Sequence, residues 1–321
     1  MSHANPELLT SYADGIHAID ALYVRPGMVA IHLIVEKGRA AFFDCGTNAS
    51  MPQVLGALER LGVATGAVDY VIPSHVHLDH AGGAGAMMAA FPNARLVVHA
   101  RGARHMADPA KLMAATREVY GDEATSALYG ELVPVQRERI IEAADGMALD
   151  LAGRRLTLLD TPGHAKHHIC LVDSTTGHVF SGDAFGFSYR ELDVGGRAFV
   201  FPSTSPAQFD PQAMHASIER ILALKPAAVY VTHFSRVTEI ERLGADLHRL
   251  VDLHCALARR ALAAPEDKRP ALILDGLRAL LMQEKAGQGW ELDDAALFSL
   301  FDDELDVNAQ GLLAWSPEPR Q

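Results

Sequence analysis

The segment 74–83, SHVHLDHAGG, places three histidines and one aspartate within six consecutive positions. Side chains two apart in an extended segment point the same way, so His75, His77 and Asp79 can converge. His80 can reach the same region from the turn into the next helix. Neutral imidazole and carboxylate groups are ligands for zinc, iron and manganese. Because burying four such groups together is unfavourable unless something binds them, the segment predicts part of a metal site.

Three further residues of ligand type stand where other apolar, strand-like runs end. His164 follows LTLLDTPG, Asp183 follows HVFSG and His233 follows AVYVT. A buried strand that delivers one polar side chain into a loop is how a rigid scaffold presents a functional site. A single histidine at a strand end is more often structural. Together with residues 75–80, however, the three predict the partners that a site for two metal ions requires.

The elements that must position these residues are indicated by the hydrophobic pattern. Residues 28–46 and 168–185 are typical of hairpins, whereas other strand-like runs alternate with helical patterns. This mixture predicts two mixed sheets packed face to face with helices outside, rather than one parallel sheet. Residues 108–132 predict a helical insertion over the sheet. From about residue 237 onward only helices are predicted.

Four short motifs, taken in order, resemble the metal motifs of the metallo-β-lactamase-fold superfamily: HVHLDH (75–80), TPGH (161–164), GD (182–183) and TH (232–233). The resemblance covers about residues 15–240. It implies an α/β (α+β) fold, a four-layer αββα sandwich with the site at one edge of the two sheets. We expect this catalytic domain to span residues 1–240. Residues 241–321 would then form a C-terminal helical appendage that caps the site, mediates oligomerisation, or does both.

The resemblance also implies a division of the ligands between two divalent metal ions. One ion would take His75, His77 and His164, the other would take Asp79, His80 and His233, and Asp183 would bridge both. Zinc is the expected metal, and iron and manganese accept the same ligand set.

The reaction expected from such a site is hydrolysis by a hydroxide that bridges the two metal ions. The substrate would be a small ester, thioester or lactone, as in the glyoxalase II and lactonase branches of the superfamily. Asp79 would orient the water or accept its proton. His168, Tyr189 and Arg190 are further candidates for the substrate pocket, and we expect His167 to be an exposed neighbour of the site.

Two other classes of function remain open from the sequence. One is an iron-dependent redox or oxygen-binding enzyme, of the persulfide dioxygenase or diiron type. Flavodiiron proteins generally carry Glu where this chain has His77, which weakens the diiron alternative. The other is a signalling or binding protein that keeps a metal site and acts through protein contacts.

The composition of the chain disfavours some classes of binding partner. Forty acidic residues against 28 basic ones give a formal charge of −12, which disfavours binding to nucleic acid or to an anionic membrane. No run of apolar residues reaches the length of a membrane span, and the N-terminal residues lack a secretory pattern. The three cysteines are far apart, as expected for reduced thiols. We therefore expect a cytoplasmic protein that acts on a small molecule and forms a homodimer through its helical appendage.

Overall fold

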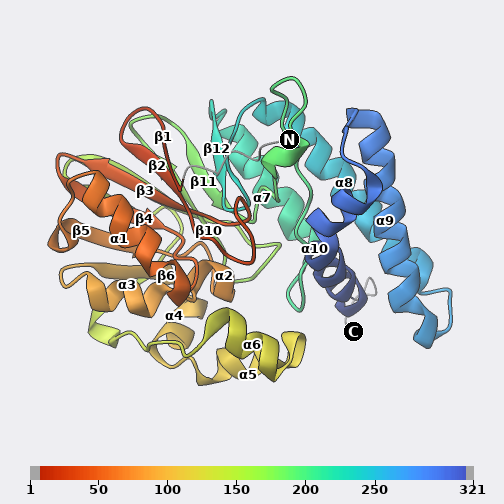
Figure 1. The fold of residues 1–321 in the computed structure, drawn as a ribbon, viewed down its shortest axis with the longest axis horizontal. Helices are drawn as coiled ribbons and strands as arrows, with labels where there is room; N and C mark the ends of the chain where they lie inside the picture. Colours follow the sequence, from red (N-terminus) through yellow and green to blue (C-terminus); the bar gives the residue numbers. More distant parts are fainter. Residues whose placement is uncertain (1–7, 316–321) are drawn as a thin grey trace.

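Two β-sheets lie face to face in the computed structural model, which describes residues 8–315 (Figure 1). In the first sheet, strands β1 to β4 pair antiparallel and strands β4 to β7 pair parallel. Its strands in spatial order are β1 (Leu9–Ser11), β2 (Ile16–Asp20), β3 (Ala30–Glu36), β4 (Arg39–Phe43), β5 (Val68–Ile72), β6 (Arg95–His99) and β7 (Ile140–Ala143). The hairpin predicted for residues 28–46 is formed by β3 and β4.

The second sheet is antiparallel except for the pair β11 and β12, which is parallel. Its strands in spatial order are β13 (Ser235–Val237), β12 (Val229–Val231), β11 (Val179–Gly182), β10 (Ile169–Asp173), β9 (Arg154–Asp160) and β8 (Ala148–Leu151). The hairpin predicted for residues 168–185 is formed by β10 and β11.

Alternate side chains of the strands fill the space between the sheets and the space outside them. On β4, Phe43 faces the other sheet, and its ring centroid lies 5.9 Å from that of Phe180 on β11. The preceding residue, Phe42, faces outward and stacks on Phe91 with a centroid distance of 5.4 Å. Helices cover the outer faces, so central strands such as β3 and β4 are buried on both sides, which explains why they are apolar almost throughout.

Helices flank the two sheets on their outer faces (Figure 1). Those over the first sheet are α1 (Met51–Arg60), α3 (Ala84–Ala90) and α4 (Ala100–Ala107), and α7 (Pro211–Ala223) and α8 (Ile240–Ala261) cover the second. Helix, sheet, sheet and helix form the predicted αββα sandwich. Short 3-10 helices lie in the connections: η1 (Asn48–Ser50), η2 (Thr65–Ala67), η3 (Arg137–Arg139), η4 (Arg190–Leu192) and η5 (Glu266–Lys268).

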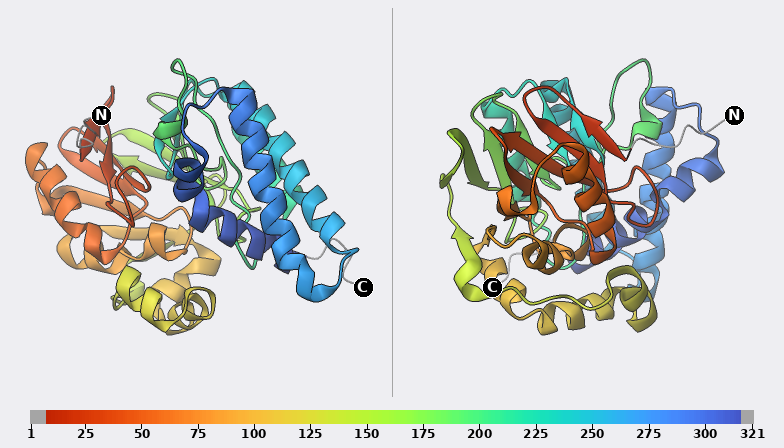
Figure 2. Two further views of the ribbon diagram at one scale, coloured as in Figure 1. Left: turned by 45° about the vertical axis from the view of Figure 1, so that its right-hand side comes forward. Right: turned by 60° about the vertical axis from the view of Figure 1, so that its left-hand side comes forward.

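The C-terminal part of the chain is helical, as predicted. Helices α8, α9 (Arg269–Gln288) and α10 (Asp294–Ala314) pack together beside the second sheet (Figure 2). Their apolar residues, for example Leu247, Leu277 and Leu305, belong to the same buried cluster as Val229 of β12. Although these are long helices, none of the helices within residues 8–315 has a stretch long and apolar enough to span a bilayer.

The insertion predicted for residues 108–132 is helical and comprises α5 (Ala110–Tyr120) and α6 (Asp122–Tyr129). Its position differs from the prediction. Leu78, the first residue of the short helix α2 (Leu78–Ala81), packs with Met113 of α5 and Tyr129 of α6. The insertion therefore covers the segment that carries the first four predicted ligands, rather than the face of a sheet.

Candidate metal centre

All seven predicted ligand residues lie at one edge of the sandwich, where strands of both sheets end. β5 leads into residues 73–77, and Asp79 and His80 lie in the first turn of α2. His164 follows β9. Asp183 and His233 follow β11 and β12, which are parallel neighbours and so end at the same edge.

Two glycines allow the loops of this edge to approach one another closely. Gly182, which precedes Asp183, has a φ of +51°, and a Cβ at this position would lie 2.5 Å from Cβ of Ser74. Gly163, which precedes His164, has a φ of +139°, and a Cβ there would lie 2.4 Å from Cα of Met214. The glycines of the GD and TPGH motifs are thus required for the positions of the polar residues that follow them.

Three histidines form the first of two clusters of ligand-type atoms. Nε2 of His164 lies 3.1 Å from Nε2 of His75 and 3.0 Å from Nδ1 of His77. His75 and His164 are buried, and His77 is partly exposed. Three imidazole nitrogens thus converge from two loops that belong to different sheets.

The second cluster combines a carboxylate with two histidines. Oδ2 of Asp79 lies 3.2 Å from Nε2 of His80 and 3.3 Å from Nε2 of His233. The two histidine nitrogens are 3.3 Å apart. This cluster therefore joins the start of α2 to the end of β12.

Asp183 stands between the two clusters and faces both. Its Oδ1 lies 3.3 Å from Nε2 of His80 and 3.5 Å from Nε2 of His233. Its Oδ2 lies 3.5 Å from Nε2 of His164, in the first cluster. Within the described residues, the buried Oδ1 has no hydrogen-bond partner, which is unfavourable for a carboxylate oxygen unless a cation binds it.

These separations fit the ligand shells of two metal ions. Two ligand atoms bound to one tetrahedral zinc ion lie roughly 3.3–3.6 Å apart. The corresponding atoms of the two clusters are 3.0 to 3.5 Å apart. The two His/Asp clusters are thus consistent with a dinuclear metal site.

The two clusters differ in their charge. Burial lowers the pKa of His77 and that of His164 to about 3, so both imidazoles are neutral near pH 7 and can offer lone pairs. Burial also opposes a charge on His80, but the carboxylates of Asp79 and Asp183 raise its pKa well above the ordinary value. The first cluster thus consists of neutral donors, and the second is rich in negative charge.

Asp44, which follows β4, supports the second cluster from behind. Its buried Oδ2 lies 2.9 Å from Nδ1 of His80, and the hydroxyl of Thr232 donates to the same oxygen. Its Oδ1 accepts the backbone N–H of Ser74 at 2.6 Å. A carboxylate at the far nitrogen of a histidine fixes the ring and its tautomer, which leaves Nε2 of His80 free to face the cluster.

Backbone carbonyls orient two further histidines in the same way. Nδ1 of His233 lies 3.0 Å from the carbonyl oxygen of Met28, and Nδ1 of His164 lies 3.3 Å from that of Ser203. In each ring the Nδ1–H donates to a carbonyl, so the unprotonated Nε2 points into the cluster.

Comparison with known proteins decides the family. The sequence profile described as the Metallo-beta-lactamase superfamily matches residues 24–233, which is more than half of the chain and includes both clusters. The chain belongs to the metallo-β-lactamase superfamily.

Relatives of this superfamily member are identical to it at about a quarter of the aligned positions. The Metallo-beta-lactamase fold-containing protein ST1585 of Sulfurisphaera tokodaii is 27% identical over 225 residues, 68% of this chain and 78% of that protein. A hydroxyacylglutathione hydrolase of Acidiphilium cryptum is 27% identical over 252 residues, 77% of this chain and 82% of the hydrolase. The chain is thus a distant homologue of hydroxyacylglutathione hydrolases.

Solved structures of the superfamily support the whole fold. The crystal structure of ST1585 from Sulfolobus tokodaii superimposes with a TM-score of 0.65 at 22% identity, covering 94% of this chain and 99% of that one. The metallo-β-lactamase family protein TTHA1429 from Thermus thermophilus gives 0.62 at 20% identity, covering 90% and 94%. The likeness thus extends beyond the sandwich to the C-terminal helices.

A cavity of about 520 Å³ opens above the two clusters of this superfamily member. His77, Asp79, His164, Asp183 and His233 contribute to its floor. Its walls come from α5, α6 and α10, from the segment that follows β2 and from the loop of residues 203–208. Most of the wall residues are apolar or aromatic, among them Tyr23, Val24, Leu112, Ala115, Val119, Tyr120, Leu128, Tyr129 and Val307.

The histidines of the TPGHAKHH segment have different positions. His168 is buried beneath Asp183, whose backbone N–H donates to its Nε2 at 3.2 Å, and it is not among the residues that line the cavity. His167 does line the cavity and is only 8% exposed. The prediction of an exposed His167 is therefore wrong. Lys166 is exposed instead, because the loop turns His167 inward against the ring of His77.

Tyr189 and Arg190 also lie outside the set of residues that line the cavity. Tyr189 is fully buried, and its hydroxyl donates to the carboxylate of Glu304 on α10. The guanidinium group of Arg190 donates to the backbone carbonyl of Ser188 at 2.7 Å. Glu304 itself lines the cavity, so Tyr189 contacts the cavity wall through it.

Asp44 and the cavity-lining residues of α10 were missed by sequence reasoning. Asp44 had a usable signal, because it follows the apolar run AAFF just as the predicted ligands follow their strands. The α10 residues Asp303 and Glu304 had none, since they lie about seventy residues beyond the last ligand.

Proposed function

We propose that this chain is a metallohydrolase that uses two divalent metal ions to cleave a small ester, thioester or lactone. One ion is held by His75, His77 and His164, the other by Asp79, His80 and His233, and Asp183 binds both. Zinc is the proposed metal, because imidazole nitrogens and carboxylate oxygens are among its usual ligands. Iron and manganese accept the same ligands.

The position of Asp183 carries this proposal. Its two carboxylate oxygens face opposite clusters, at 3.3 Å from His80 and 3.5 Å from His164. A carboxylate that served only one ion would leave its second oxygen buried without a partner. A bridge between two ions satisfies both oxygens at once.

Metal ions held by the two clusters would lower the pKa of a bound water and would polarise a carbonyl group of the substrate. The residues of the chain do the remaining work. Asp44 fixes the ring of His80, so that the second cluster keeps its shape during the reaction. Asp79 can orient the water, although its basicity is reduced because His80 and His233 hold its pKa well below the usual range despite burial. The apolar walls of the cavity exclude other water from the carbonyl group.

Distant homology supports hydrolysis of acyl compounds. Several relatives are hydroxyacylglutathione hydrolases, including those of Acidiphilium cryptum and Stenotrophomonas maltophilia, at 27% and 28% identity. The name of these relatives states hydrolysis of a hydroxyacylglutathione. Hydrolysis of an acyl compound, whether thioester, ester or lactone, needs attack of water on a carbonyl carbon.

Elemental analysis together with a hydrolysis panel tests the proposal. Protein purified without chelators or nickel is expected to contain two zinc ions per chain and to cleave at least one ester, thioester or lactone. Asp183→Asn should lower the content of both ions, because it removes the bridging charge. Asp267→Asn, at an exposed position in η5, is the matched control. Full retention of both ions in Asp183→Asn contradicts the bridge, and iron without any hydrolysis favours the redox alternative.

We also propose that the C-terminal helices cap the site. The support comes from α10, which contributes Asp303, Glu304 and Val307 to the cavity wall. Because α10 also packs through Phe301 against Tyr189, its position is tied to the loop that follows Asp183. Val307→Ala is expected to raise KM while the metal content stays the same; an unchanged KM would contradict a capping role.

A further inference from the structure

One face of α5 forms an apolar stripe along the catalytic cavity. The residues Leu112, Ala115, Thr116 and Val119 line it, at the spacing of three and four residues that places side chains on one side of a helix. Val119 remains 38% exposed although it is apolar. Such a stripe suits an apolar segment of the substrate, which would displace water from these side chains.

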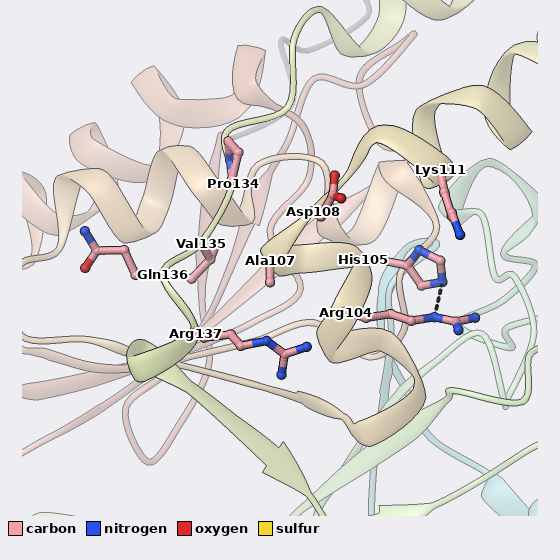
Figure 3. Close-up of a pocket in the computed structure, with 9 residues that line it drawn as sticks. All are labelled: Arg104, His105, Ala107, Asp108, Lys111, Pro134, Val135, Gln136 and Arg137. Carbon is pink, nitrogen blue, oxygen red and sulfur yellow. Dashed lines mark hydrogen bonds between the residues drawn. The ribbon is translucent and has the colours of Figure 1, made fainter.

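A second pocket, of about 640 Å³, adjoins the cavity at the beginning of this stripe. His105 and Lys111 line both of them, so the two spaces meet at these side chains. Arg104, His105 and Lys111 gather at one end of the second pocket, and Arg137 of η3 extends toward them (Figure 3). We refer to this space, lined by Arg104, His105, Lys111 and Arg137, as the basic pocket.

The positive charge of the basic pocket is not neutralised by the acidic group nearest in sequence. Asp108 is the only carboxylate among the nine lining residues, and within the described residues it forms no ion pair with Arg104, Lys111 or Arg137. Burial lowers the pKa of His105, and the charges of Arg104 and Lys111 lower it further, so the positive charge comes from Arg104, Lys111 and Arg137 and not from His105. A concentration of positive charge therefore persists here in a chain whose formal charge is −12.

The acidic side chains of the cavity wall come from a different element. Asp303 and Glu304 lie on α10, whereas Lys111 lies on α5. An anionic group is repelled near α10 and attracted toward the basic pocket, which gives an asymmetric substrate one preferred orientation.

We propose that the basic pocket binds an anionic group of the substrate, a carboxylate or a phosphate, while the apolar segment of the same molecule lies along α5. The inference depends on the proposed hydrolase function and specifies its substrate class: an acyl compound with an apolar chain and a negatively charged end. Arg104 and Arg137 offer the planar N–H donors that pair with carboxylate or phosphate oxygens. Lys111 provides a charge at the boundary between the two spaces.

Matched substrates test the proposal on the metal-loaded enzyme. Aryl esters of straight-chain acids that end in a methyl group are compared with esters of equal length that end in a carboxylate or a phosphate. We expect kcat/KM to be about tenfold higher for one anionic series, as a single charge-assisted contact would give. The carboxylate and phosphate series distinguish the two anions. The preference should decrease as salt concentration rises.

Variants of the basic pocket locate the effect. Arg137→Gln and Arg104→Gln, both at exposed positions, should lower the ratio of kcat/KM for the anionic ester to that for the neutral ester about tenfold. Arg101→Gln is the matched control, because Arg101 is an exposed arginine of α4 that lines neither space. Equal rates for anionic and neutral esters in the wild type, or the same ratio in Arg137→Gln, would overturn the inference and leave the hydrolase proposal intact.

A binding measurement covers the case in which no ester, thioester or lactone is cleaved, which would refute the proposed hydrolase instead. Calorimetry then measures the binding of a straight-chain dicarboxylate and of inorganic phosphate to the metal-loaded wild type and to metal-loaded Arg137→Gln. Weaker binding of either anion to the variant supports the basic pocket as an anion site. Identical binding to both proteins overturns it.

Discussion

The metal-site clusters and the helical wall of the cavity are neighbours that are held in place by different interactions. At the clusters, directional hydrogen bonds fix the rings: Asp44 holds His80, and the carbonyl group of Met28 holds His233. The wall formed by α5 and α6 is held mainly by packing, with the hydroxyl pair of Tyr23 and Tyr129 at 2.7 Å as a polar contact. Directional bonds tolerate little displacement, whereas packed apolar surfaces accept exchanges of similar volume.

This difference indicates that the two regions have separate roles, one in metal binding and the other in substrate binding. Strand ends from both sheets supply groups whose geometry determines whether metal can bind at all. In the proposed function, the helices at the edge would determine which molecule fits above the clusters. Changes in the clusters should therefore alter metal content and turnover together, whereas changes in the wall should alter substrate affinity alone.

The largest effect is expected from removal of a ligand in the first cluster. His164→Ala takes away the imidazole that faces both His75 and His77, so metal content should fall and activity should decrease by more than about 100-fold. Elemental analysis and initial rates measure both. His178→Ala, a half-buried histidine beside β11, is the control. Normal metal content in His164→Ala would contradict the claim that the clusters, unlike the helical wall, determine metal binding.

A smaller effect is expected from the carboxylate behind the second cluster. Asp44→Asn keeps the size of the side chain but removes its charge, so metal affinity should fall about 10–100-fold, as measured by competition with a chelator. Asp20→Asn is a matched control, since Asp20 is also a buried aspartate after a strand-like run, and its oxygens accept the N–H groups of Leu22 and Gly27. Equal losses in both variants would show that any buried carboxylate has this effect.

The helical wall should respond differently. Leu128→Ala shortens a half-buried side chain of the cavity, which removes about 1 kcal/mol of apolar contact with a bound substrate. KM for the best substrate should rise about fivefold, while the metal content stays the same. Leu272→Ala, an exposed position on α9, should change neither. A loss of metal in Leu128→Ala would mean that the wall and the clusters are not separable.

The smallest effect concerns a buried histidine outside both regions. His32 lies between the sheets against Phe180 and Tyr230, and burial lowers its pKa to about 4. The unfolded chain binds a proton there below pH 6.5 and the folded chain does not, so this site reduces stability as the pH falls from 6.5 to about 4. Between pH 7.5 and pH 5.5 the stability of His32→Leu relative to the wild type should therefore rise by about 1 kcal/mol.

Urea unfolding of the metal-free proteins at pH 5.5 and pH 7.5 measures this difference, and metal content should be unaffected. Both ring nitrogens of His32 lack hydrogen-bond partners within the described residues, so leucine loses no polar contact. A constant difference between the two proteins at both pH values would contradict the assignment.

Much of the metal site could be predicted from the sequence because its signals are local. Four ligand-type residues lie within six positions, and each of the other three directly follows an apolar strand. The same rule would have selected Asp44, but one aspartate after a strand has no neighbouring motif that separates it from a structural residue such as Asp20. His167 was misjudged because its sequence position does not show which way the loop after Gly163 turns.

The sequence by itself indicated which residues converge, because four ligand-type residues lie within six positions and each of the other three follows an apolar run closely. It also indicated that residues 108–132 and the chain from about residue 237 are mainly helical, because the spacing of apolar residues fixes that period. Only the tertiary structure decided where those helices lie. An apolar stripe shows that a helix face is covered or lines a cavity, but not what faces it, because packing is non-directional and many partners can bury the same surface. The wall, the basic pocket and the contact of α10 with the site therefore appear only in three dimensions.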